Sequence, residues 1–295
     1  MHRSDPLSTS TWGTAADLVD ILDVRRTGDR RFEGIARADE QRHVVEGSQI
    51  LAQAMVAAAR QTQGRRAVSA HMAFARAGDA NQPLWFDLDE ISAGRTFTAL
   101  SVTVGQGDRL CASGTLLLDV TAPDVIRHAS EPPRVAVPDG SIPCEMAMAG
   151  REVRVVDGAY TDDPDAPVGP PVIDTWVRFD DVPPDPDLHV GLLVQFTGHM
   201  SIASALRPHP GIGQTEAHRT LSTAVNAIYV SVHAEIRADR WMLYHHHSTF
   251  AGAGMTHSQC TVHSEDGDLL ASFCVDAMLR SFAKKTSGLD PRTAL

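Results

Sequence analysis

The most regular pattern of apolar and small residues in the chain lies between residues 46 and 63. Its apolar side chains recur at three- and four-residue spacing, which is typical of one face of a helix. These residues are Ile50, Leu51, Ala54, Met55 and Ala58. Most other positions in the segment are alanine, so neighbouring backbone can approach closely. We therefore expect a slim central helix around which a sheet can curl.

The first residues of this helix, Glu46, Gly47 and Ser48, suggest chemistry. The first N–H groups of a helix have no acceptor within the helix, and the helix dipole makes that end positive. The backbone of Gly47 and Ser48 is therefore a candidate binding site for a carbonyl oxygen. Glu46 is a candidate general base. The alternative is that its negative charge only complements the dipole.

Strand patterns surround this helix. A short amphipathic helix is predicted at residues 16–22 and a strand at residues 31–36. After the central helix, alternating apolar and polar positions predict four strands. They span residues 68–75, 84–91, 96–104 and 110–120. The order is therefore a strand, a long helix and four strands.

The same order returns in the second half, after a proline-rich segment at residues 122–150 that we interpret as a linker. Alternation at residues 151–156 and 172–179 predicts strands. Residues 192–206 are rich in small side chains and predict a second helix, whose end near Gly198 matches the start of the first helix and makes Gly198 a further candidate for binding substrate. Four further strands are expected at residues 223–233, 241–249, 256–263 and 269–279.

An internal repeat accounts for this similarity. Shifting the chain by 160 residues aligns residues 93–110 with residues 253–270, with seven identities in 18 positions and no gap. A repeat of this size indicates two copies of one small domain rather than a solenoid. Two such copies can join edge to edge and so bury their strand edges.

Composition narrows the classes of partner. The chain has 295 residues and a formal net charge of −11, which argues against nucleic acid as a partner. Its four cysteines are widely spaced and show no zinc-binding spacing, which favours free thiols in a reducing compartment. The first residues lack the apolar segment of a signal peptide, and no apolar run approaches about 18 residues. We expect a cytoplasmic protein with no membrane partner.

Several short segments together resemble the type II acyl-CoA thioesterases of the TesB-like family, whose fold is a double hotdog. The resemblance covers about residues 16–283. In the first half it rests on residues 46–54, 74–79 and 94–97. In the second half it rests on residues 206–209, 241–244, 248–249 and 266–272. Their order and spacing carry the similarity, because no single motif decides it.

The resemblance implies an α+β fold of two fused hotdog domains, each an antiparallel sheet wrapped around a helix. The domains would span residues 16–121 and 151–283, with a C-terminal tail at residues 284–295. It implies an acyl-CoA or related thioester as the ligand, no cofactor, and hydrolysis by direct water attack at a site between the copies. Association into a homo-oligomer stays open, since two copies per chain already supply the pairing of single hotdogs.

The sequence departs from the family at three expected site positions. In the family an Asp at the second helix, a Thr or Ser on the next strand and a Gln on the last strand hold and activate water. The ungapped matches place Gly198, Val225 and Val275 at these positions. The usual site therefore cannot be transferred to this chain.

Polar neighbours of those positions become candidates. They are His199, Asn226 and Asp276. A shift of one residue on a strand turns a side chain to the opposite face, which weakens the case for Asn226 and Asp276. Structural alternatives are a helix-end histidine at 199, a satisfied core amide at 226, and a carboxylate at 276 paired with an arginine or a helix end.

The run from His245 to His247 is a candidate metal site, yet only its first and last members share a strand face. We therefore expect no metal. The leading functional hypothesis is an acyl-CoA thioester hydrolase. The alternatives are a catalytically silent acyl-CoA-binding or scaffold protein, and an acyl-thioester hydratase or dehydratase on the same fold.

Overall fold

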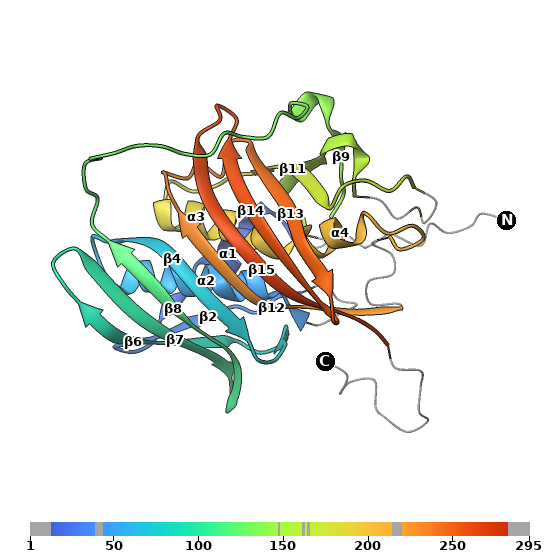
Figure 1. Ribbon diagram of the computed structural model, residues 1–295. Helices are drawn as coiled ribbons and strands as arrows, with labels where there is room; N and C mark the ends of the chain where they lie inside the picture. Colours follow the sequence, from blue (N-terminus) through green and yellow to red (C-terminus); the bar gives the residue numbers. More distant parts are fainter. Residues whose placement is uncertain are drawn as a thin grey trace, which may run out of the picture.

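One antiparallel sheet of thirteen strands curves around the helices (Figure 1). The computed structural model describes residues 13–38, 44–146, 148–160, 163, 166–213 and 220–282. A separate two-stranded pair joins β3 (Val44–Val45) to β5 (Gly78–Asp79). No helix among the described residues is long and apolar enough to cross a membrane.

The sheet has the same strand order in both halves, read from opposite edges. The first half contributes β1 (Arg25–Arg26), β2 (Arg31–Gly34), β6 (Leu84–Ala93), β7 (Phe97–Gln106), β8 (Arg109–Asp119) and β4 (Arg66–Phe74). The second half continues with β12 (Leu221–Val232), β15 (Leu269–Ser281), β14 (Met255–Ser264), β13 (Met242–Gly252), β11 (Val172–Phe179), β10 (Arg151–Val155) and β9 (Ile142–Pro143). The order from β2 to β4 matches the reversed order from β11 to β12. This pseudo-twofold arrangement confirms the repeat.

The two halves meet where β4 pairs with β12. His71 lies opposite Tyr229, and Met72 lies opposite Ile228. Met72 and Ile228 are buried, whereas Tyr229 faces outward. The edge strand of each copy is thus paired with the other copy, as expected from the cost of leaving strand edges open.

The predicted slim helix is α2 (Gly47–Gln61), and every residue from Ser48 to Ala59 on it is buried. Gln53 sits at its centre and donates from Nε2 to the carbonyl oxygens of Ile21, at 2.7 Å, and Ile35, at 2.9 Å. Ile21 belongs to α1 (Ala15–Leu22), so this amide fastens the short first helix to the central one.

The predicted second helix differs from a single continuous element. The chain forms α3 (Pro186–Gln195), a 3-10 turn η3 (Phe196–Gly198) and α4 (Ser201–Leu206). Met200 has a left-handed backbone with φ of 62°, which ends the helical path between η3 and α4. Two further 3-10 turns, η1 (Pro138–Gly140) and η2 (Val156–Gly158), flank β9 and β10.

Helices α2 and α3 pack against each other in opposite directions. Glu46, before the start of α2, lies beside Gln195 at the end of α3. Arg60, in the last turn of α2, lies 3.3 Å from Asp185, the N-cap of α3. This pairing brings the N-terminal end of α2 to the break that follows α3.

Candidate active site

The first turn of α2 forms one side of the candidate site. Glu46 is the N-cap residue, and its carbonyl oxygen accepts from the backbone N–H groups of Gln49 and Ile50. Its side chain makes no capping hydrogen bond and is 49% exposed. Gly47 packs so tightly on Phe74 that an added Cβ would lie 2.9 Å from the ring. A glycine is therefore needed where the helix begins.

The break after α3 forms the other side. Residue 199 leaves the helical path, and the His199 side chain turns toward α2, where its Nε2 lies 3.3 Å from Glu46 Oε2. Only 12% of the His199 side chain is exposed. The sequence placed His199 at the start of a helix, whereas the structure places it in the extended residue before α4.

Four side chains close a polar ring, which consists of Glu46, Arg151, Gln195 and His199. Arg151 Nη1 donates to Gln195 Oε1 at 2.7 Å, and Gln195 Nε2 donates to Glu46 Oε2 at 3.3 Å. Arg151 Nη2 lies 3.3 Å from His199 Nε2, which in turn lies near Glu46. Both ends of the Gln195 amide are thereby oriented, with oxygen toward the cation and nitrogen toward the carboxylate.

Arg151 is the partly buried cation of the polar ring. Burial lowers the pKa of its guanidinium, and the negative charge of Glu46 opposes that shift. The guanidinium also lies over the Phe196 ring, 5.1 Å from its centre. The His199 nitrogen Nε2 therefore lies between a guanidinium donor of Arg151 and the Glu46 carboxylate, 3.3 Å from each.

Gly198 and Ser48 are two of the predicted substrate-binding residues. They face each other where the first turn of α2 meets the break after α3, a contact that we call the junction. A Cβ added at Gly198 would lie 2.5 Å from Ser48 Oγ. The space of a side chain at 198 is therefore occupied by the hydroxyl of Ser48. The two strand positions matched to the family's site are apolar, with Val275 buried and Val225 packed against the core.

Asn226 and Asp276 do not join this junction. Asn226 is exposed at a bulge in β12, which contradicts the interpretation as a core amide. Asp276 is exposed on the outer face of β15 and lies 2.7 Å from His257 Nδ1, so its partner is a histidine rather than an arginine or a helix end. Among the described residues, neither Asn226 nor Asp276 forms a hydrogen bond or an ion pair with Glu46 or His199.

The histidine run divides between the two faces of β13. His245 Nδ1 lies 2.7 Å from Asp174 Oδ1. The His246 side chain, on the opposite face, is fully buried. In the part of the chain that the structure describes, no three His, Cys, Asp or Glu side chains are grouped as metal ligands would be.

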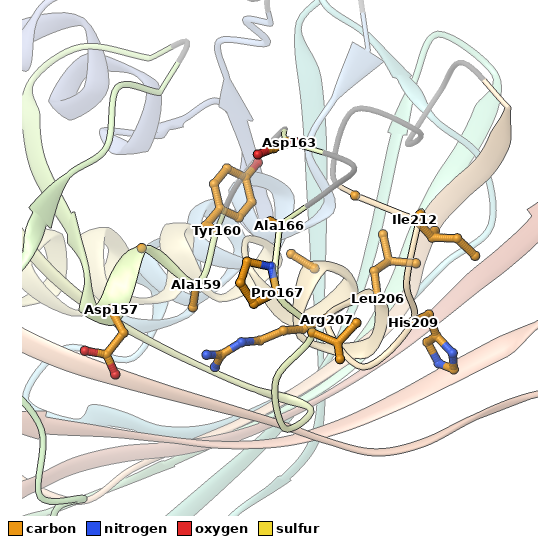
Figure 2. Close-up of a pocket in the computed structure, with 15 residues that line it drawn as sticks. Asp157, Ala159, Tyr160, Asp163, Ala166, Pro167, Leu206, Arg207, His209 and Ile212 are labelled. Carbon is orange, nitrogen blue, oxygen red and sulfur yellow. The ribbon is translucent and has the colours of Figure 1, made fainter.

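A cavity of about 230 Å³ lies at the far end of α4 (Figure 2). Ala203 and Leu206 line it from the helix, and Tyr160 and Pro167 line it from the segment after η2. Arg207 borders this cavity, but its guanidinium donates to the Val172 carbonyl oxygen. The cavity shares α4 with the candidate site and lies at the opposite end of that helix from His199.

Sequence reasoning missed Arg151 and Gln195. Arg151 was assigned only to the start of a strand, and Gln195 was one polar residue within an apolar helix. The available signal was their type, because an arginine and a glutamine withdrawn from solvent both require partners. Which partners they find depends on the packing of α3 against α2.

Comparison with known proteins identifies the family. The N-terminal domain of acyl-CoA thioesterases matches residues 36–118, and their C-terminal domain matches residues 123–274. The chain belongs to the acyl-CoA thioesterase family. This membership favours thioester hydrolysis over a hydratase or a scaffold.

Relatives agree over most of the chain. Acyl-CoA thioesterase 2 of Haemophilus influenzae is 24% identical over 284 residues, which cover 90% of this chain and 97% of the relative. Human acyl-coenzyme A thioesterase 8 is 24% identical over 261 residues, covering 79% of this chain and 80% of the relative.

Solved structures share the fold. A tesB protein from Mycobacterium avium subspecies paratuberculosis superposes with a TM-score of 0.76 at 23% identity, covering 90% of this chain and 99% of the other. The acyl-CoA thioesterase II TesB2 of Mycobacterium marinum gives 0.75 at 23% identity, with 90% and 98% covered. The predicted double hotdog is thus confirmed.

Proposed function

We propose that this chain hydrolyses acyl-CoA thioesters by direct attack of water, with Glu46 as the general base. The observation that carries the proposal is the polar ring at the N-terminal end of α2. It holds a half-exposed carboxylate beside a partly buried guanidinium, an oriented amide and a histidine. A carboxylate in this setting can accept a proton from a bound water.

The reaction balances without a covalent enzyme intermediate. The water oxygen forms a bond to the thioester carbonyl carbon, and Glu46 takes one water proton. The N–H groups at the start of α2 stabilise the oxyanion that forms. When the intermediate collapses, the carbon–sulfur bond breaks and its electron pair goes to sulfur, which receives the proton. The products are a carboxylic acid and the free thiol of CoA.

The other members of the polar ring hold Glu46 in place. Gln195 fixes Oε2 of the carboxylate, and Arg151 fixes Gln195. His199 Nε2 lies 3.3 Å from the same oxygen, within reach of the proton that Glu46 removes from water. Asn226 and Asp276 have no role in this scheme.

Thiol release from acyl-CoAs of several chain lengths tests the proposal. Wild-type protein is expected to turn over at least one of them. Glu46→Gln keeps the shape of the side chain but removes the base, so it is expected to lower kcat at least about 100-fold. Asp276→Asn, on the outer face, is the matched control and should keep wild-type turnover. Tight acyl-CoA binding without thiol release would instead support a silent binding protein.

The cysteines favour a location for the protein in the cell. Acyl-CoA metabolism in the cytoplasm would suit a protein whose four cysteines, Cys111, Cys144, Cys260 and Cys274, are all free thiols. Fractionation of cells that produce the protein would test this location.

A further inference from the structure

The first turn of α2 contains two buried polar groups without partners. Ser48 is 1% exposed and Gln49 is 3% exposed. Neither Ser48 Oγ nor Gln49 Nε2 makes a hydrogen bond to any residue that the structure describes. A buried polar group without a partner is costly, so each such group calls for an explanation.

Other buried serines near the junction are satisfied. Ser204 donates to the Ser201 carbonyl oxygen at 2.8 Å, and Ser258 donates to the same oxygen at 3.3 Å. Ser201 lies 4.0 Å from the Cys260 sulfur. Packing therefore provides partners for these neighbouring serine hydroxyls, whereas the Ser48 hydroxyl finds none among the described residues.

The position of Ser48 indicates which ligand. Its Oγ lies where the side chain of residue 198 would begin, and residue 199 is the histidine of the polar ring. Two residues before Ser48, Glu46 holds the carboxylate of that ring. The unpaired hydroxyl thus lies at the contact between the first turn of α2 and the break that carries His199.

We propose that the Ser48 hydroxyl is a catalytic group that binds and orients the attacking water, whose proton passes to Glu46. This inference rests on the proposed hydrolysis and names a residue for it. In this arrangement Glu46 supplies the carboxylate, Ser48 the hydroxyl and Gln195 the amide. The chain lacks the family's polar residues at positions 198, 225 and 275. The water completes the hydrogen bonding of Ser48, which the protein alone leaves unsatisfied.

Ser48→Ala is the direct test, with Ser204→Ala as the matched control. Both remove a buried hydroxyl from a helix, but only Ser204 loses a hydrogen bond within the protein. Ser48→Ala should lower kcat about 100-fold while KM and the affinity for a non-hydrolysable thioether analogue of acyl-CoA stay within about twofold. Its melting temperature should equal or exceed that of wild type, whereas Ser204→Ala should melt lower and keep kcat.

Three outcomes would overturn the inference. If Ser48→Ala retains wild-type kcat while Glu46→Gln is inactive, the inference fails and the proposed function stands. If wild-type protein releases no thiol from any acyl-CoA, both fail together. If Ser48→Ala melts lower than Ser204→Ala, the hydroxyl has a structural role. Ser48→Gly provides the same kinetic comparison should the alanine variant not fold.

Discussion

Single residues decide the chemistry of the junction. Arg151 is a partly buried cation near the negative charge of Glu46, and its two terminal nitrogens contact Gln195 and His199. A buried charge is tolerated when it is paired and hydrogen-bonded. The guanidinium therefore orients Gln195 and His199 directly, and Glu46 through Gln195. This role accounts for an arginine at the start of β10.

The contact between Ser48 and Gly198 predicts energetic coupling. Gly198→Asp alone should lower the free energy of unfolding by about 1–3 kcal/mol, because its Cβ would lie 2.5 Å from Ser48 Oγ. Ser48→Gly/Gly198→Asp should recover most of that loss in chemical denaturation. Gly140→Asp, on the η1 turn, should combine additively with Ser48→Gly to within about 0.5 kcal/mol. Additive effects of the Ser48 and Gly198 changes would contradict the contact.

His246 predicts a pH dependence of stability. Burial lowers its pKa to about 3, and the backbone of Ile173 and Tyr244 offsets this only in part. The unfolded state, with a pKa near the ordinary value of 6.5, binds this proton more readily, so stability falls as pH falls below that value. Between pH 7 and pH 5 the loss is about 2 kcal/mol.

Denaturation of His246→Phe at both pH values checks this expectation. The variant should lose about 2 kcal/mol less than wild type between pH 7 and pH 5. His247→Phe changes an exposed neighbour and should keep the wild-type slope. Equal slopes for wild type and His246→Phe would show that the imidazole is not held neutral.

At the scale of elements, α2 is the scaffold that the site depends on. Its alanines allow α3 to approach, and Gln53 fastens α1 and the strand-connecting segment at Ile35 to it. Gln53→Leu would leave two carbonyl groups without their donor. We expect a loss of about 1–3 kcal/mol in the free energy of unfolding. Gln63→Leu, just past the helix, is the exposed control and should change stability by less than about 0.5 kcal/mol.

The sequence predicted α2 and the long strands well because their patterns are local. The period of three to four residues gave α2, and alternation gave strands such as β11, whose predicted bounds match the structure. The break after α3 was missed because Met200 adopts its left-handed backbone within an otherwise helical composition. That conformation depends on packing of η3 beneath the sheet, which no local pattern encodes.

The candidate site was only partly predictable for the same reason. Glu46 and His199 were selected because helix ends and missing family residues mark positions along the chain. Arg151 and Gln195 join them only through the antiparallel packing of α2 and α3. Asn226 and Asp276 were selected as neighbours in sequence, but both are exposed, on β12 and β15.

At the scale of the whole molecule, we expect the two hotdog copies to unfold as one cooperative unit. The sheet continues from β4 to β12, and α2 packs on α3, so each copy completes the core of the other. Calorimetry should give one unfolding transition, with equal calorimetric and van't Hoff enthalpies. Two separate transitions would indicate copies that fold independently and a site that forms only after they dock.

The central claim is that Glu46 activates water for direct attack on an acyl-CoA thioester. A single turnover with excess protein in water enriched in ¹⁸O tests it most directly, by mass analysis of the released acid. We predict one ¹⁸O atom in the acid from the first turnover, and a rate of acid formation at least about 100-fold lower for Glu46→Gln. An acid without ¹⁸O in that turnover would contradict the claim, because its new oxygen would come from the protein through a covalent intermediate.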